Sequence, residues 1–598
     1  MDKTVFVIFS FLLGASLVIS QNAKVDIYIH GKDVEVIGEE QVIPWEGQSF
    51  TIHKYLGLPF AEPPVGDLRF RKSIPLEYMD SPFYAVDFGM PCVQFNFYKE
   101  AEFPQSEDCL YLNVYVPGRP ADSTSGHAVA IWIHGGSYIE GSALQYDATF
   151  MSLYGNVIVV TINYRLGVYG FLTTEDEHAP GNYAFWDQHM AFRWVNEHIK
   201  QFGGDPDRVT IFGESAGAMS VSKQGIVPLN QGLFRRIIAQ SGSPLHPPDY
   251  YAKGRARHVG ELLNCDTTSS KPLTECLRQV TNYELMKALK DNKFAVMDLG
   301  YVLDYELFSF DHSKIPWLLE EKNLDGVEFY RSLDVMNGFN EYEGLTITDI
   351  FFSYLHEKDY LISRDEMREL MTSSLGWLAG TETDDSVIEM TLHEYTNWTD
   401  PEAKENVRLQ FVKLFGDWIF GAPAIKTAQI HVHASYTGNF FYHFTANHSF
   451  GPLESPEWLP GANHADELPF MFGVEVYKPD LDPSTSWEIQ LSRKMVTYWT
   501  NFMKNGNPNE GDPVSPYWPV YDMSTYSYLN LEENTTEESI GHHLYTKETN
   551  FWYNVFPHVN YAVQDHTYVE PCVSSAFINI PSSIVMMLSS ILAFIIVL

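Results

Sequence analysis

A serine between two glycines is the strongest sign of chemistry in this sequence. Residues 213–217 read Gly-Glu-Ser-Ala-Gly, with Ser215 at the centre. An apolar segment typical of a short strand, residues 209–212, precedes the motif, and small residues suited to a helix start follow it. A G-x-S-x-G segment between a strand and a helix forms a tight turn that exposes the serine hydroxyl, and its glycines make room for the turn. We therefore predict that Ser215 is a nucleophile.

A serine hydroxyl becomes an effective nucleophile only when a base accepts its proton and a third group orients that base. Histidine is the usual base, but the chain has 21 histidines, so residue type alone does not select one. For the orienting acid, residues 338–344 place two carboxylates close together, Glu341 and Glu343. Residue types leave both as candidates.

The elements expected to position these residues are alternating strands and helices. Residues 128–133 are typical of a buried strand, and residues 157–163 of a strand buried on both faces. Residues 187–202 space their apolar side chains at near-helical intervals, and a Gly-Gly pair ends that pattern before the strand at 209–212. Strands that alternate with helices in this order favour a parallel sheet with crossover helices, and hence an α/β fold.

Several motifs, in the same order along the chain, resemble those of type-B carboxylesterases and cholinesterases. They are YLGLPFAEPP at 55–64, EDCLYLN at 107–113, NYRLG at 163–167, DQ at 187–188, FGGDP at 202–206, GESAG at 213–217 and WTNF at 499–502. The resemblance covers roughly residues 42–556. It implies an α/β-hydrolase fold, with a large, mostly parallel central sheet, helices on both faces and long insertions.

The same resemblance assigns the base and the acid that residue types left open. His464 lies in residues 461–473, which resemble the family's histidine loop. Glu343, and not Glu341, matches the acid of the family's G-x-N-x-x-E-G motif. The implied catalytic triad is therefore Ser215, Glu343 and His464.

The resemblance also implies an oxyanion hole, which stabilises the tetrahedral intermediate through backbone N–H donors. Ala216 follows the nucleophile and is expected to supply one donor, and Gly136 and Ser137 are expected to supply the others. The family commonly has glycine or alanine where Ser137 stands. Serine keeps its N–H, so this departure bears on rate and acyl size and not on the type of reaction.

The implied reaction is hydrolysis of a small-molecule carboxylic ester through an acyl-enzyme on Ser215, with no metal or organic cofactor. A general carboxylesterase is the favoured interpretation. A cholinesterase is the alternative: Glu214 and the formal charge of −38 support it, but the segment between Cys92 and Cys109 has no tryptophan to bind a quaternary ammonium. A non-catalytic, neuroligin-like adhesion protein is disfavoured because all the triad residues are kept.

Five cysteines predict two disulfides and one residue left over. Cys92 with Cys109 and Cys265 with Cys276 are the natural local pairs, and both fall where the family places its own bridges. Cys572 is left over, and it predicts an intersubunit disulfide in a homodimer.

The two ends of the chain indicate the secretory pathway. Residues 1–20 are typical of a signal peptide, and residues 571–598 of a GPI-anchor signal or a retained hydrophobic tail, with a single α/β-hydrolase domain expected over 21–570. We therefore expect an extracellular protein, either secreted or held at the cell surface. The acidic balance, 77 Asp plus Glu against 39 Lys plus Arg, disfavours nucleic acid as a partner.

Glycosylation is expected in such a protein at N-x-S/T sequences. The chain has three of them, at Asn397, Asn447 and Asn534. Each is an acceptor only if it is exposed.

Overall fold

A computed structural model describes residues 21–45, 47–95, 104–245, 252–291, 302, 305–308, 325–379, 384–432, 438–448, 450–453, 455–478 and 480–560. The predicted signal peptide and the C-terminal tail with Cys572 lie outside these residues. Of the helices that are described, none is both long and apolar enough to cross a membrane.

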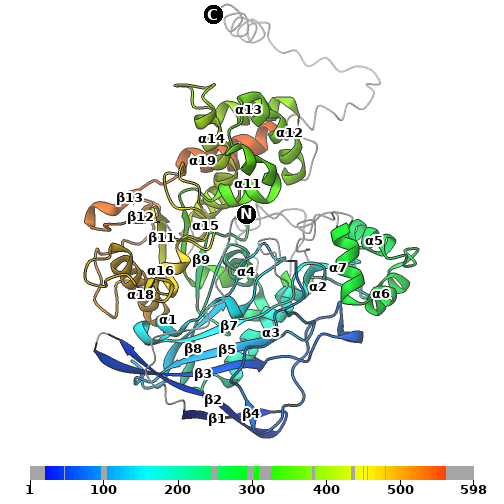
Figure 1. Cartoon of the computed structure of the whole chain (residues 1–598), viewed down its shortest axis with the longest axis vertical. Coiled ribbons are helices and arrows are strands. Elements are labelled where there is room, and N and C mark those ends of the chain that lie inside the picture. Colours follow the sequence, from blue (N-terminus) through cyan, green and yellow to red (C-terminus); the bar gives the residue numbers. More distant parts are fainter. Residues whose placement is uncertain are drawn as a thin grey trace, which may run out of the picture.

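A mixed sheet of 13 strands forms the centre of the molecule (Figure 1). Its strands are β1 (Gln21–Ile29), β2 (Lys32–Trp45), β3 (Gln48–Pro59), β4 (Phe83–Tyr84), β5 (Tyr111–Pro117), β6 (His127–Ile133), β7 (Ile158–Ile162), β8 (Gly204–Glu214), β9 (Arg236–Gln240), β10 (Asp334–Asn340), β11 (Asn439–Phe444), β12 (Ser527–Leu531) and β13 (Ile540–His542). The order is β1-β2-β3-β5-β7-β6-β8-β9-β10-β11-β12-β13, and β4 pairs with β2.

The strands from β7 to β12 run parallel, whereas β1, β2, β3 and β5 at one side and β13 at the other pair antiparallel. The loops that follow β6, β8, β10 and β11 therefore leave the sheet at the same edge. Ligands of open α/β sheets bind outside the carboxyl ends of the parallel strands. The predicted site residues all follow these strands.

The central strands are buried on both faces, as their apolar sequences predict. In β6, Val129, Ile131 and Ile133 pack into one core, whereas Ala128, Ala130 and Trp132 pack into another on the opposite face. Alternate side chains of a strand point to opposite faces, so an unbroken apolar sequence requires cover on both.

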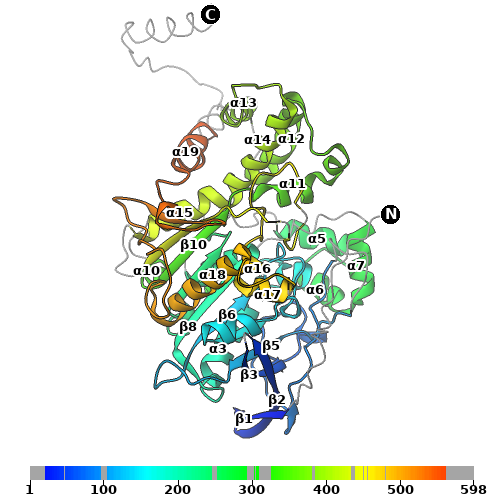
Figure 2. The same cartoon turned by 60° about the vertical axis from the view of Figure 1, so that its left-hand side comes forward.

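Helices supply that cover, as Figure 2 shows from a second side. The helices α3 (Tyr183–His198) and α4 (Ala216–Gln224) bury their apolar side chains in the first core. The helices α1 (Thr149–Gly155), α16 (Leu468–Phe472) and α18 (Trp487–Asn505) bury theirs in the second. The predicted α/β fold with helices on both faces is thus confirmed.

The structure has further α- and π-helices, many of them in the long insertions between β9 and β10 and between β10 and β11. They are α2 (Gly167–Phe171), α5 (Ala252–Leu262), α6 (Ser270–Gln279), α7 (Asn282–Asp291), α8 (Tyr305–Phe308), α10 (Asp325–Arg331), α11 (Gly344–Phe352), α12 (Arg364–Ala379), α13 (Asp385–Glu394), α14 (Lys404–Gly416), the π-helix η7 (Asp417–Gly421), α15 (Ala422–Val432), α17 (Val474–Tyr477), α19 (Thr546–Asn550) and the π-helix η9 (Phe551–Val555).

A helical layer lies beyond the carboxyl edge of the sheet, at the top of Figure 1. It consists of α11 to α14 with α19, and most of it is inserted between β10 and β11. Its side chains form an apolar cluster of their own, to which the C-terminal Phe551, Trp552 and Phe556 contribute. This layer therefore connects the C-terminal helices to the region of the predicted site.

The elements predicted from the sequence are present with small shifts at their ends. The strands predicted at 128–133, 157–163 and 209–212 correspond to β6, β7 and β8. The helix predicted at 187–202 is α3, which begins earlier, at Tyr183, because the aromatic side chains that open it are also buried.

Candidate functional site

The turn that carries Ser215 has the geometry predicted for an exposed nucleophile. β8 ends at Glu214 and α4 begins at Ala216, so Ser215 alone makes the turn, with φ 55° and ψ −123°. This is a backbone conformation that non-glycine residues rarely adopt. The flanking glycines permit it: a Cβ at Gly217 would lie 2.0 Å from the Ile133 carbonyl oxygen, and one at Gly213 would lie 2.6 Å from Gly217.

The structure brings His464 and Glu343 into direct contact. Glu343 follows β10 and His464 follows β11, two neighbouring parallel strands. His464 Nδ1 contacts Glu343 Oε2, and both side chains are buried. A carboxylate at Nδ1 holds the ring's other nitrogen, Nε2, available to act as a base.

The Glu343 carboxylate is itself held in place by two donors. The Ser241 hydroxyl donates to its Oε1 at 2.5 Å, and the Asn340 backbone N–H donates to the same oxygen at 2.5 Å. The alternative acid, Glu341, directly follows β10, where its backbone N–H donates to the Phe444 carbonyl oxygen of the neighbouring strand β11 at 3.1 Å. Of the two carboxylates, Glu343 is the one that contacts His464.

A third carboxylate, which the sequence analysis considered only as support for a cholinesterase, faces the imidazole. Glu214 Oε1 lies 3.0 Å from His464 Nε2. Burial raises the pKa of Glu214 above its usual range, and the facing His464 lowers it. Burial lowers the pKa of His464, but Glu214 and Glu343 raise it by more, to about 9. The sequence signal for this contact was that Glu214 directly precedes the nucleophile Ser215.

A fourth carboxylate supports the loop that holds His464. Glu467 is fully buried, and its two oxygens accept hydrogen bonds from Gln240 Nε2 at 3.0 Å and Asn340 Nδ2 at 2.7 Å. Gln240 in turn accepts from Trp499 Nε1 at 3.0 Å. These bonds join strands β9 and β10 and helix α18 to the histidine loop. The sequence analysis missed Glu467, although it lies within the segment that resembles the family's histidine loop.

The predicted oxyanion loop lies directly against the nucleophile. A Cβ at Gly135 would lie 3.1 Å from Ser215 Cβ, so the loop after β6 leaves no room there for a side chain. Gly136 has φ 103° and Ser137 has φ 53°, so the chain turns sharply at both residues. Ala216 is the first residue of α4, and its N–H is among those that have no partner within the helix. The three predicted donors therefore lie on the two segments that flank Ser215.

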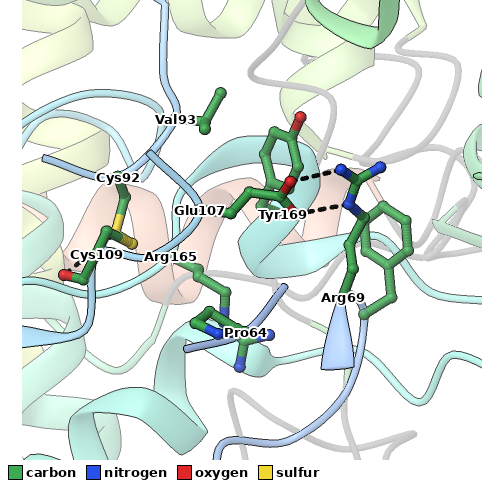
Figure 3. Close-up of a pocket in the computed structure, with 9 residues that line it drawn as sticks. Pro64, Arg69, Cys92, Val93, Glu107, Cys109, Arg165 and Tyr169 are labelled. Carbon is green, nitrogen blue, oxygen red and sulfur yellow. Dashed lines mark hydrogen bonds and ion pairs between the residues drawn. A yellow bond between two sulfur atoms is a disulfide. The ribbon is translucent and has the colours of Figure 1, made fainter. Parts of the chain in front are cut away.

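Both predicted disulfides are present, Cys92–Cys109 and Cys265–Cys276. The first borders a small pocket, and Figure 3 shows the ion pair beside it, in which the Arg69 guanidinium binds both oxygens of Glu107. Arg69 also donates to the Leu277 carbonyl oxygen of α6 at 3.0 Å. The pocket's lining includes no residue of the predicted triad, so we assign it a structural role at the base of the disulfide loop.

The three predicted glycosylation sites lie on the surface. Asn447 and Asn534 are exposed and Asn397 is partly exposed. No group of three or more potential metal ligands occurs among the residues that the structure describes.

The arrangement is suited to nucleophilic acyl transfer. A strained serine, a histidine in contact with a carboxylate, and the backbone of the two segments beside the serine lie at one edge of the sheet, where the imidazole Nε2 faces Glu214. These are the parts that covalent catalysis at a carbonyl carbon requires.

Comparison with known proteins agrees with this geometry. The family model described as "Carboxylesterase family" matches residues 26–552. Mouse carboxylesterase 5A is 34% identical over 556 residues, which cover 89% of this chain and 88% of the relative. Mouse acylcarnitine hydrolase is 34% identical, with 85% and 87% covered, and mouse liver carboxylesterase 1 is 34% identical, with 88% and 92% covered.

Proposed function

We propose, for a chain that belongs to the carboxylesterase family and is a carboxylic ester hydrolase, that cleavage proceeds through a covalent acyl-enzyme on Ser215. The observation that carries this proposal is the contact between His464 Nδ1 and Glu343 beside the strained turn of Ser215. A histidine held in this way accepts the serine proton at Nε2.

Acylation begins when Ser215 Oγ attacks the ester carbonyl and His464 Nε2 takes its proton. The carbonyl oxygen becomes an oxyanion, which the N–H groups of Gly136, Ser137 and Ala216 stabilise. Each such donor is worth about 3 to 4 kcal/mol of barrier. His464 then returns the proton to the departing alcohol, and the acyl group stays on Ser215.

Deacylation repeats these steps with water in place of the alcohol. His464 removes a proton from water, the hydroxide attacks the acyl carbon, and the acid leaves as Ser215 regains its proton. The contact of Nε2 with Glu214 occurs in the free enzyme, and catalytic hydrogen bonds often tighten only when substrate is bound.

Neutral carboxylic esters are the proposed substrates. Two of the relatives bear the name carboxylesterase, and the segment between Cys92 and Cys109 lacks a tryptophan for cation binding. A cationic ester is the second candidate, because Glu214 faces the site and the relative named acylcarnitine hydrolase is 34% identical. The adhesion alternative is not proposed, since the chain is a carboxylic ester hydrolase and keeps all three predicted triad residues.

The test compares kcat/KM for a neutral acetate ester and for a choline ester of the same acyl group, with Ser215→Ala as the control. Equal or faster cleavage of the neutral ester supports the general carboxylesterase. A preference of tenfold or more for the choline ester, about 1.4 kcal/mol in the transition state, identifies a cation site. Activity that persists in Ser215→Ala contradicts the acyl-enzyme proposal.

The predictions about location and assembly are part of the same proposal. The two disulfides support an oxidising compartment, and the exposed Asn447 and Asn534 support glycosylation. In animal cells, a mass decrease on enzymatic deglycosylation and release by a phosphatidylinositol-specific phospholipase would support a glycosylated, GPI-anchored protein. A dimer on a non-reducing gel that Cys572→Ser abolishes would support the intersubunit bridge.

A further inference from the structure

An irregular turn interrupts the long helix that passes beside the site. α14 ends at Gly416, the π-helix η7 spans Asp417–Gly421, and α15 begins at Ala422. The backbone angles stay right-handed helical at Gly416 and at Ala422, so the chain remains helical through both junctions. A single π turn within an α-helix is rare and is frequently found at functional sites. The segment is therefore a candidate for a role in the site, although no residue of it is in the predicted triad.

The side chain that η7 presents to the site is Phe420. Its ring centroid lies 4.6 Å from that of His464, with the two planes at 36°. Phe420 is only 1% exposed, and His464 is also buried. One side of the imidazole is thus covered by a hydrocarbon ring, and its edges meet Glu214 and Glu343.

The same helix also contacts the acid of the triad. A Cβ at Gly416 would lie 3.0 Å from the Gly344 backbone nitrogen and 3.4 Å from Glu343 Cβ. Gly416 and Phe420 are four residues apart, which places them on one side of a helix. One helix segment therefore packs against both Glu343 and His464.

Hydrogen bonds anchor the irregular turn to the helical layer. The buried Asp417 accepts a hydrogen bond from Tyr395 Oη at 2.9 Å, and Trp552 Nε1 donates to the same hydroxyl at 2.8 Å. The rings of Trp418 and Trp552 stack with centroids 5.6 Å apart. Because the first two residues of the turn are held, the position of Phe420 is set by the insertion and by the C-terminal helix.

We propose that Phe420 is a positioning residue for the catalytic base, which acts by fixing the plane of the His464 ring and by keeping water from one side of it. The π turn is the feature that directs this ring at the imidazole. The inference rests on the proposed function, because it assigns to His464 the role of the base. It extends that function to a residue from the helical insertion.

Packing alone would produce a different result from positioning. Phe420 belongs to the apolar cluster of the helical layer, so its replacement lowers stability in either case. Positioning in addition changes kcat and the pH at which the base becomes active. The charged groups that face His464 are Glu214 on β8, Glu343 after β10, and Asp466 and Glu467 on its own loop. None of these carboxylates is altered by a substitution at 420.

The experiment compares Phe420→Leu with Phe415→Leu in the full chain. Phe415 is a fully buried member of the same cluster, and its ring contacts are with Phe352 and Phe411. Kcat, KM, the pH profile of kcat/KM and the thermal midpoint are measured for each with a neutral ester. Phe420→Met, which fills the same space with a flexible chain, and Phe420→Tyr, which keeps the ring, extend the comparison.

The expected result for Phe420→Leu and Phe420→Met is a kcat lower by about 10- to 100-fold with KM nearly unchanged. The acid limb of the profile moves to higher pH, because water that reaches the imidazole favours its charged form. Phe415→Leu loses thermal stability but keeps the wild-type kcat and the wild-type acid limb of the kcat/KM profile. Phe420→Tyr also keeps the wild-type acid limb.

Two results would overturn the inference. One is a wild-type kcat and pH limb in Phe420→Leu or Phe420→Met, and the other is the same shift in Phe415→Leu. If Ser215→Ala remains active, the proposed function fails. If Ser215→Ala is inactive and the Phe420 variants behave as wild type, the positioning role alone fails.

Discussion

His464 Nε2 lies 3.0 Å from Glu214 Oε1, so the imidazole has a carboxylate at each nitrogen. Burial disfavours a charged ring, but the two carboxylates favour it more strongly, and together they raise the pKa of His464 to about 9. An imidazolium cannot accept the Ser215 proton. The activity should therefore increase with pH in a range that lies above the ordinary pKa of histidine.

Glu214→Gln is expected to move the acid limb of kcat/KM to lower pH. The substitution removes one negative charge that stabilises the imidazolium, so the pKa of His464 falls and the neutral base persists at lower pH. The measurement is the pH profile of kcat/KM with an uncharged ester. Glu341→Gln, which removes a carboxylate that is not in contact with His464, is the control and should leave the limb in place. An unchanged limb in Glu214→Gln would show that Glu214 does not set the charge of the ring.

Glu343→Gln is expected to lower kcat by about 10⁴-fold, because an amide that donates to Nδ1 holds the ring in the wrong tautomer. The matched control is again Glu341→Gln, two residues away on the same loop. Its kcat should stay close to that of the wild type. Steady-state kinetics at saturating ester measure both, and equal losses would mean that the acid of the triad is assigned wrongly.

Much of this fold and site could be predicted from the sequence, because its signals are local. The apolar sequence of β6 predicts a buried strand, and the glycines around Ser215 predict the tight turn. The contact of Glu214 with His464 could not be predicted, since it depends on how the loops after β8 and β11 meet.

The π turn at Asp417–Gly421 was equally hidden in the sequence. Its residues carry no local signal for an irregular helix, and the turn is held by tertiary bonds from Asp417 to Tyr395 and from Tyr395 to Trp552. Tertiary contacts of this kind override local preference, so Phe420 could be placed beside His464 only from the folded chain.

Gly136→Ala is expected to lower kcat by about 10²- to 10³-fold, the loss expected for one oxyanion donor. Gly136 has φ 103°, and a Cβ there would lie 2.2 Å from the Glu140 carbonyl oxygen, so the loop must shift. Ser137→Ala keeps the backbone N–H and should change kcat only slightly with an acetate ester. The two variants are compared at saturating substrate, and a large loss in Ser137→Ala alone would assign the donor role to the serine side chain.

Asp417→Asn is expected to stabilise the protein more at high pH than at low pH. Burial raises the pKa of Asp417 well above its usual range, so the native state keeps a proton that the unfolded chain releases. That contribution to stability is present below the ordinary carboxyl pKa and is lost as the pH rises toward the native one. Asparagine does not ionise and still accepts the Tyr395 hydrogen bond.

The thermal midpoints of Asp417→Asn and the wild type test this sign. Their difference should grow as the pH rises above the ordinary carboxyl pKa, over the range in which the unfolded carboxyl is ionised and the native one keeps its proton. A difference that is constant or shrinks with pH would mean that Asp417 is charged in the folded protein.

The most direct test of the central claim is to identify the residue that an active-site phosphonate modifies. The full-length protein is treated with a fluorophosphonate ester, from which the nucleophile displaces fluoride, and its peptides are analysed by mass spectrometry. We predict one phosphonyl group per chain, on Ser215, with labelling abolished in Ser215→Ala and strongly slowed in His464→Ala. An adduct on another serine, or labelling that Ser215→Ala leaves intact, would contradict the acyl-enzyme mechanism.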